Sequence, residues 1–152
     1  MSTRAIAFLK SEGIPYEIVQ YPHEEKGAAY AARALGYALE ATVKTLVVDL
    51  GNRSYSLALM PGHRPLDMKK MARACGVKRA AMADTATAER LTGYRVGGIS
   101  PFATQHPLSA VMEESLLRNK QVLINAGQRG TMLQMDPAEI VRALGCPTAA
   151  LC

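Results

Sequence analysis

The stretch TVKTLVVDLGNRSYSLALM, residues 42–60, decides the fold. Its first part, residues 42–50, is rich in β-branched and apolar residues, which is typical of a strand. Gly51-Asn52 gives a turn signal, and residues 54–60 return as a second apolar strand. The stretch therefore predicts a β-hairpin against which the other elements must pack.

The residues on both sides of this hairpin predict helices that alternate irregularly with strands. Asp67, Asp84 and Asp136 each precede a helical pattern that ends at a glycine. Ser2 is expected to cap a first helix, and residues 27–35 form an Ala-rich helical stretch. Further strands are expected near residues 16–21, 79–83, 109–112, 121–126 and 131–135. This order predicts a mixed sheet with helices packed on it.

The size and composition fit one globular domain covering residues 1–152. Hydrophobic residues make up 49% of the chain and charged residues 20%, an ordinary globular balance. A chain of 152 residues buries roughly two-thirds of its unfolded surface, so it needs no disulfide or metal to stabilise it. No internal repeat and no linker divides it.

The sequence carries no signal for export, for a membrane or for a metal. No segment reaches the roughly eighteen apolar residues that span a bilayer, and the first ten residues lack the apolar run of a signal peptide. Cys75, Cys146 and Cys152 are widely spaced, and the three histidines lie far apart. We therefore expect a cytoplasmic protein with reduced thiols, no metal and no cofactor.

Lys44 is the most informative single residue. Side chains alternate along a strand, so Lys44 shares a face with Leu46, Val48 and Leu50. A cation at the end of an apolar row either finds an anionic or strongly polar partner or loses its charge. A substrate carbonyl, ribose or phosphate could be that partner. The alternative is that Lys44 reaches water at the edge of the strand, and the strand pattern alone favours this alternative.

Two glycine-rich turns could hold a ligand through their main-chain N–H groups. Gly97 and Gly98 carry no Cβ atoms, so a ligand can approach their backbone closely. The turn after Asn125-Ala126 offers the same opportunity, and Arg129 adds a charge there. Neither string matches a nucleotide-binding fingerprint, and either turn alone could be no more than a tight connection.

Basic residues cluster between positions 64 and 79. The net charge is +5 and the isoelectric point is about 9.3, which permits a polyanionic partner. A one-sided basic helix face suits phosphate contacts, but a solvated face is an equally good interpretation. The candidate phosphate-binding residues are Lys69, Lys70, Arg73, Lys78 and Arg79.

An ordinary protein nucleophile is missing. Ser100 does not lie in a G-x-S-x-G elbow, and no Ser, His and Asp can be assigned to a catalytic triad. If the protein is a hydrolase, its residues must act by positioning and electrostatics.

Three strings give the sequence a family resemblance. They are VKTLVV at residues 43–48, MAD at 82–84 followed by LTGYRVGGISP at 91–101, and NAGQRG at 125–130. In order and spacing they resemble the YbaK family of aminoacyl-tRNA deacylases, which is related to the editing domain of bacterial prolyl-tRNA synthetases. The opening, residues 5–21, also fits, so the resemblance runs over nearly the whole chain.

The resemblance implies an α/β fold of the mixed α+β type, with a curved mixed sheet that is partly barrel-like and helices around it. It implies hydrolysis of the ester between an amino acid and the 3′ end of a tRNA, with Lys44 as the residue on which activity depends. The implied turn at residues 98–101 and Tyr21 border the pocket. With the two glycine turns, the candidate substrate-binding residues are Tyr21, Gly97, Gly98, Ile99, Ser100, Pro101, Asn125, Ala126 and Gly127.

The resemblance also implies a mechanism and partners. In its Cys-specific branch the thiol of the substrate is thought to attack its own ester, and another branch is thought to use water. The expected function is trans-editing of Cys-tRNA(Pro), or of another small amino acid on tRNA(Pro), with main-chain N–H groups stabilising the oxyanion. The partners are the tRNA acceptor end and possibly prolyl-tRNA synthetase.

Three departures from the Cys-specific branch lie next to the implied pocket. The chain continues Ser-Pro with Phe102-Ala103-Thr104-Gln105-His106, and it has Asn125 where that branch usually carries Ser. It also has Met132 where members of that branch can carry an acidic residue. These departures bear on the amino acid more than on the reaction. The alternative function is a non-catalytic module that binds tRNA or a synthetase.

Overall fold

The computed structural model describes residues 2–22 and 28–152. Five helices and eight strands are described, with two short 3-10 helices, η1 and η2. Their bounds are α1 Arg4–Ser11, β1 Glu17–Gln20, α2 Ala28–Leu35, η1 Leu39–Ala41, β2 Val43–Gly51, β3 Ser54–Pro61, α3 Met68–Ala74, β4 Ala81–Met82, α4 Thr85–Thr92, β5 Ser109–Glu113, η2 Glu114–Arg118, β6 Val122–Gln128, β7 Thr131–Met135, α5 Pro137–Leu144 and β8 Thr148–Ala149.

The strands form two sheets. The larger sheet has the order β4-β2-β3-β5-β8, and the smaller has the order β1-β7-β6. The β3–β5 and β5–β8 pairs are parallel and the others are antiparallel, so the prediction of a mixed sheet in an α+β fold is confirmed. The partly barrel-like sheet is not confirmed, because both sheets stay open in the described part of the chain. An isolated bridge between Thr42 and Leu123 joins them.

The predicted hairpin is present, with its turn one residue later than expected. β2 and β3 pair in antiparallel register from Val43↔Pro61 to Gly51↔Ser54. Asn52 and Arg53 form the turn, and both have positive φ, as a two-residue type I′ turn requires. Gly51 stays in the strand after a register shift at Asp49, which explains why it does not form the turn itself.

Local capping signals set the helix ends. Asp67, Asp84 and Asp136 each cap a helix through a side-chain oxygen, as predicted. The first helix is capped by Thr3 instead of Ser2, because the Thr3 hydroxyl accepts from the Ile6 N–H, three residues ahead.

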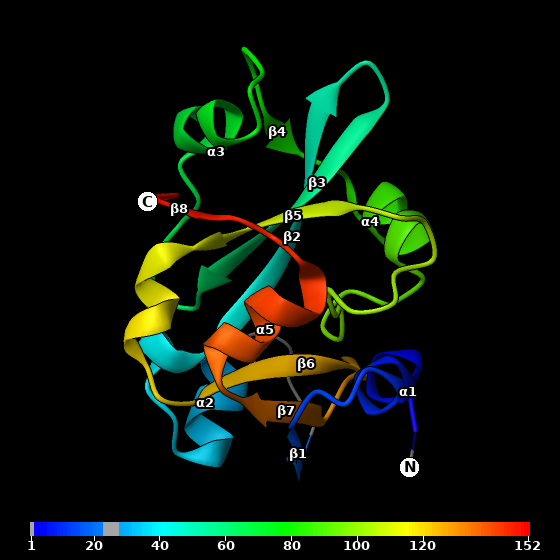
Figure 1. The fold of residues 1–152 in the computed structure, drawn as a ribbon, viewed down its shortest axis with the longest axis vertical. Coiled ribbons are helices and arrows are strands. Elements are labelled where there is room, and N and C mark those ends of the chain that lie inside the picture. Colours follow the sequence, from blue (N-terminus) through cyan, green and yellow to red (C-terminus); the bar gives the residue numbers. More distant parts are fainter. Residues whose placement is uncertain (1, 23–27) are drawn as a thin grey trace.

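The larger hydrophobic core lies between the two sheets, with α1, α4 and α5 contributing to it. The two faces of β2 serve different cores. Val43 and Val47 belong to this larger core, whereas Val48 packs with Met60 and Met71 beneath α3. A third cluster lies between α2 and the smaller sheet. Figure 1 shows α3 and β4 at one end of the molecule and α2 with the smaller sheet at the other.

Two further expectations concern thiols and membranes. Cys75, Cys146 and Cys152 are free thiols, and Cys146 is buried. In the part of the chain that the structure covers, no helix has the length and apolar character needed to cross a bilayer.

Candidate functional site

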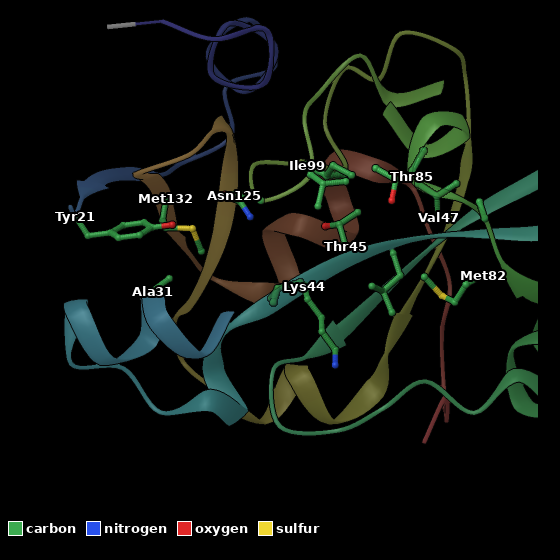
Figure 2. A pocket seen from close by; sticks show the side chains of 16 residues that line it. Tyr21, Ala31, Lys44, Thr45, Val47, Met82, Thr85, Ile99, Asn125 and Met132 are labelled. Carbon is green, nitrogen blue, oxygen red and sulfur yellow. The ribbon is translucent and has the colours of Figure 1, made fainter. Parts of the chain in front are cut away.

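The main pocket lies along the outer edge of β2, where the two sheets separate. Its volume is about 290 Å³, and its lining is largely apolar. Side chains reach it from α2, β2, β4, α4, the loop at residues 96–99, β6 and β7 (Figure 2). A site built from this many separate segments depends on the whole fold.

The pocket exists because one stretch of β2 has no neighbouring strand on that edge. The outer edge is covered at Thr42 by the bridge to β6, and at Val47 by an N–H from Ala83, 3.0 Å from the Val47 carbonyl oxygen. Main-chain groups point to alternate edges along a strand, so Thr45 faces the same edge as Val47. The N–H and C=O of Thr45 are therefore directed toward the pocket.

Two buried oxygens in the pocket wall lack hydrogen-bond partners. They are Oγ1 of Thr45 and Oδ1 of Asn125, the two buried side-chain polar atoms left unpaired among the described residues. An unsatisfied buried polar group costs roughly 1–3 kcal/mol, so such atoms are uncommon. Both residues line this pocket, and the two oxygens are buried in its wall.

Lys44 also borders the pocket and is half-buried. Figure 2 shows its side chain leaving β2 on the side opposite to Thr45 and Asn125. Burial lowers the pKa of the Lys44 ammonium, and the charge of a Cys152 thiolate acts weakly in the opposite direction. No hydrogen bond from this ammonium to a described residue is seen. Lys44 is therefore a partly desolvated cation that a ligand can reach.

The predicted substrate-binding residues fall into three groups. Tyr21, Gly97, Ile99 and Asn125 line the main pocket. Gly98 and Gly127 instead line a second cavity. Ser100, Pro101 and Ala126 are buried and line neither cavity.

Packing within the protein accounts for two of these glycines. The N–H of Gly98 donates to the Arg95 carbonyl oxygen at 2.9 Å, so it is already paired. A Cβ on Gly98 would lie 3.0 Å from the main-chain nitrogen of Arg129. A Cβ on Gly127 would lie 2.6 Å from Cε1 of Tyr94. Protein atoms occupy the position that a Cβ would take at both residues, which weakens the expectation that Gly98 and Gly127 bind the reacting ester.

Several pocket residues were not singled out from the sequence. Thr45 is next to Lys44, but its importance follows from the free strand edge, which no local pattern predicts. The other lining residues outside the predicted set are Ala31, Val43, Leu46, Val47, Met82, Ala83, Thr85, Ala88, Val96 and Met132. Met82 is 49% exposed and stands at the rim, so it can contact whatever enters.

The predicted tRNA-binding residues lie outside the main pocket. Lys69 and Arg73 are exposed on α3, and Lys78 and Arg79 are exposed just after it. Lys70 is half-buried, and its Nζ donates to the main-chain oxygen of Cys152 at 2.7 Å. The exposed cations form a basic surface, and Lys70 is partly occupied in holding the end of the chain.

No group of three His, Cys, Asp or Glu side chains with the arrangement of a metal site is found over residues 2–22 and 28–152. His23 lies outside these described residues.

Comparison with known proteins gives consistent matches over nearly the whole chain. Residues 23–143 match the profile of the family described as the aminoacyl-tRNA editing domain. A protein of Enterococcus faecalis, provisionally named Cys-tRNA(Pro)/Cys-tRNA(Cys) deacylase EbsC, is 30% identical over 142 residues, covering 91% of this chain and 86% of that protein. The multifunctional Ser/Thr-tRNA deacylase ProXp-y of Escherichia coli K12 is 30% identical over 145 residues, covering 91% and 85%.

A solved structure has the same fold as this chain. It is provisionally described as a trans-editing enzyme for prolyl-tRNA synthetase, and it superimposes with a TM-score of 0.89 at 28% identity. The superposition covers 99% of this chain and 98% of that one.

Proposed function

The chain belongs to the family of aminoacyl-tRNA editing domains, and we propose that it is a trans-editing deacylase acting on mischarged tRNA. The observation that carries the proposal is the main pocket at a free strand edge, which Thr45 and Asn125 line on one side of β2 and which the half-buried Lys44 borders on the other. A hydrolase without a protein nucleophile needs such a site, because it must hold the ester and polarise it.

The pocket volume supports a small substrate group. At about 290 Å³ it lies at the lower limit of ligand pockets, which run from roughly 300 to 1,000 Å³. This suits a small amino acid and the ribose to which it is esterified. The proposed substrate is Cys-tRNA(Pro), or another small amino acid on tRNA(Pro).

The proposed roles follow from the placement of the groups. The Lys44 ammonium is proposed to orient the ester or its ribose from its side of β2, and Thr45 and Asn125 form the pocket wall on the other side. Main-chain N–H groups stabilise the oxyanion. Gly97 and Ile99 are better placed for this than Gly98, because they line the pocket and the N–H of Gly98 is already bonded.

The reaction needs no covalent intermediate on the protein. Water, or the thiol of a cysteinyl substrate, attacks the ester carbonyl carbon and forms a new bond to it. The bond to the ribose oxygen breaks, and that oxygen leaves with a proton supplied by the attacking group. Correct positioning alone can contribute about 7–11 kcal/mol to such a step.

The tRNA acceptor end is the proposed partner, with prolyl-tRNA synthetase as a possible source of the mischarged tRNA. The exposed cations Lys69, Arg73, Lys78 and Arg79, with Lys70, are proposed to contact tRNA phosphates. Charged tRNA is a cytoplasmic substrate, and the proposal places the protein there.

A deacylation assay with a panel of mischarged tRNAs tests the proposal. We expect hydrolysis of at least one tRNA carrying a small amino acid, and a loss of about 100-fold or more in Lys44→Ala. Lys120→Ala is the matched control, because Lys120 is exposed and lines neither cavity. Tight tRNA binding without turnover on any member of the panel would instead support a non-catalytic binding module.

A further inference from the structure

The second cavity lies beside the main pocket and has a volume of about 410 Å³. It is formed by residues 93–95 and Gly98 on one side, and by residues 127–129 of the β6–β7 turn on the other. Its lining contains two arginines, Arg95 and Arg129, and no acidic residue. The proposed chemistry of the main pocket does not use this cavity.

Its cations differ in how they are held. The side chain of Arg129 is fixed, because Nε and Nη2 donate to the Val96 carbonyl oxygen at 2.9 and 2.7 Å. Arg95 is exposed, and no hydrogen bond or ion pair of its side chain is seen within residues 2–22 and 28–152. One guanidinium is therefore positioned in advance and the other is free to bind.

A third arginine and one carboxylate lie near residues of the cavity without lining it. The guanidinium of Arg4 lies over the Tyr94 ring, with Cζ 4.9 Å from the ring centroid, and its Nη2 donates to the Thr92 carbonyl oxygen. Glu89 is the nearby acid, and its Oε2 accepts from the Val96 N–H at 2.8 Å. Three arginines against one hydrogen-bonded carboxylate leave this region cationic.

The two cavities share a wall that is one chain thick. Gly97 lines the main pocket and Gly98, the next residue, lines the second cavity. On β6, Asn125 lines the main pocket and Gly127 lines the second cavity. A nucleotide whose ribose lies in the main pocket would therefore have its phosphates within reach of the second cavity.

We infer that the second cavity binds a phosphodiester of the acceptor strand next to the esterified ribose, with Arg95 as the contact that forms on binding. The planar guanidinium suits phosphate oxygens in two-point contacts. The inference rests on the proposed function, because it takes the occupant of the main pocket to be the 3′ end of a tRNA.

Two substrates distinguish a loss of phosphate binding from a general loss of activity. The first is the aminoacyl-tRNA that the wild-type protein hydrolyses best, and the second is the same amino acid esterified to adenosine, which has no phosphate. We expect Arg95→Ala to raise KM for the tRNA about five- to tenfold with little change in kcat. The ratio of kcat/KM between the two substrates should fall by a similar factor.

Arg118→Ala is the matched control, because it removes one exposed cation that lines neither cavity. If Arg95→Ala behaves like this control on tRNA, the inference is wrong. Equal losses on both substrates would also overturn it, since Arg95 would then act on the ester or on the fold.

Binding of uncharged tRNA keeps the inference testable if no hydrolysis is found. Arg95→Ala should weaken binding about fivefold at low salt, whereas Arg118→Ala should not. A wild-type protein that binds tRNA through Arg95 without turnover would contradict the deacylase proposal and leave this site standing.

Discussion

Partial burial makes the charged form of Lys44 less favourable than it would be in water. The half-buried position lowers the pKa of its ammonium below the ordinary value of 10.5, while the charge of a Cys152 thiolate partly offsets this. The cation is therefore less well solvated than a surface lysine, and an anionic or polar substrate atom can replace the lost water. This is the physical basis for giving Lys44 the central role.

The lowered pKa predicts a pH dependence. Deacylation that requires the Lys44 cation should decline as pH rises through this lowered pKa, below the ordinary 10.5. Between the two values the unfolded chain binds more protons, so the free energy of unfolding should rise with pH there. NMR titration of the lysine side chains, with Lys44→Ala to assign the signal, measures the pKa. A value at or above 10.5 would contradict the prediction.

The residues of the site differ in how well the sequence predicts them. Lys44 is predictable because one strand pattern places it on an apolar face, and this face is the one observed. Thr45 is not, because its place at the uncovered edge depends on where β4 and β6 stop covering β2. Gly98 and Gly127 are recognisable as special positions, but the groups that require glycine there come from Arg129 and Tyr94, distant in sequence.

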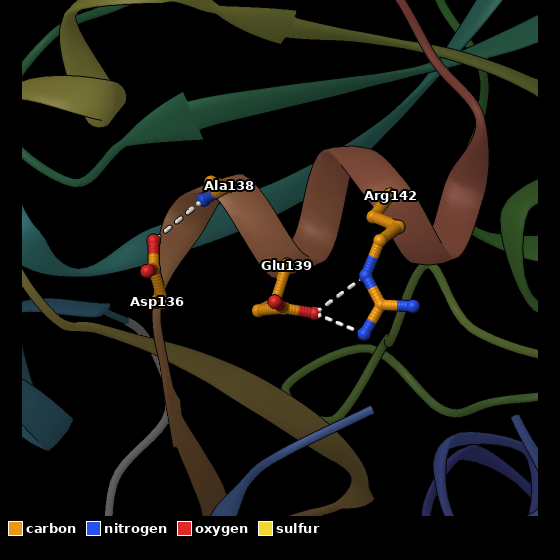
Figure 3. Close-up of polar contacts among 4 residues, drawn as sticks. All are labelled: Asp136, Ala138, Glu139 and Arg142. Atoms are coloured by element: carbon orange, nitrogen blue, oxygen red, sulfur yellow. Dashed lines mark hydrogen bonds and ion pairs between the residues drawn. The ribbon is translucent and has the colours of Figure 1, made fainter. Parts of the chain in front are cut away.

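At the scale of elements, α5 shows how local signals fix a helix. Asp136 Oδ1 accepts from the Ala138 N–H at 2.8 Å, and Pro137 occupies the first helical position (Figure 3). Farther along the helix, Glu139 pairs with Arg142 at 2.7 Å. The cap satisfies a main-chain donor, whereas the pair is partly exposed, with 55% of the Arg142 side chain and 27% of the Glu139 side chain accessible.

Asp136→Ala should therefore destabilise the protein by about 1 kcal/mol, which lowers Tm by roughly 2–4 °C in a chain of this size. Arg142→Ala is the comparison, and we expect less than about 0.5 kcal/mol, because 55% of its side chain is exposed. Thermal and urea unfolding measure both. The reverse order of the two effects would show that the cap is not what fixes the start of α5.

The elements with strong local signals are the ones the sequence predicts well. The three Asp-capped helices and the central hairpin are confirmed, because caps, glycine ends and alternation act over a few residues. The 3-10 helices and the two-residue strand β8 were not predicted, since they carry little periodicity. Strand order and the division into two sheets depend on long-range pairing.

For the whole molecule, the distribution of the net charge of +5 over the surface determines how it can affect tRNA binding. Lys69 and Arg73 stand exposed on α3, outside the main pocket and outside the second cavity. If α3 contacts tRNA phosphates, its cations release counterions on binding and make the affinity depend on salt. The basic helix and the arginine cavity would then have different roles, the first in overall affinity and the second in placing the 3′ end.

Replacing Lys69 and Arg73 together by Gln should weaken tRNA binding at low salt and reduce the slope of log K against log salt by about 1 to 2 units. Lys70 is left in place because it holds the Cys152 oxygen. The control replaces Arg118 and Lys120, which removes the same charge elsewhere. Fluorescence anisotropy over a salt series measures both slopes, and equal slopes for the two double variants would exclude α3 from the interface.

The free stretch of β2 has a further consequence for how the protein behaves in solution. An uncovered strand edge normally invites pairing with a strand of another molecule, and proteins commonly block such edges with charge or proline. Here the uncovered stretch borders the main pocket, which residues of both sheets and of α2 line. We expect the side chains that line the pocket to hinder pairing with a foreign strand, so that this stretch stays accessible to a small ligand without promoting self-association.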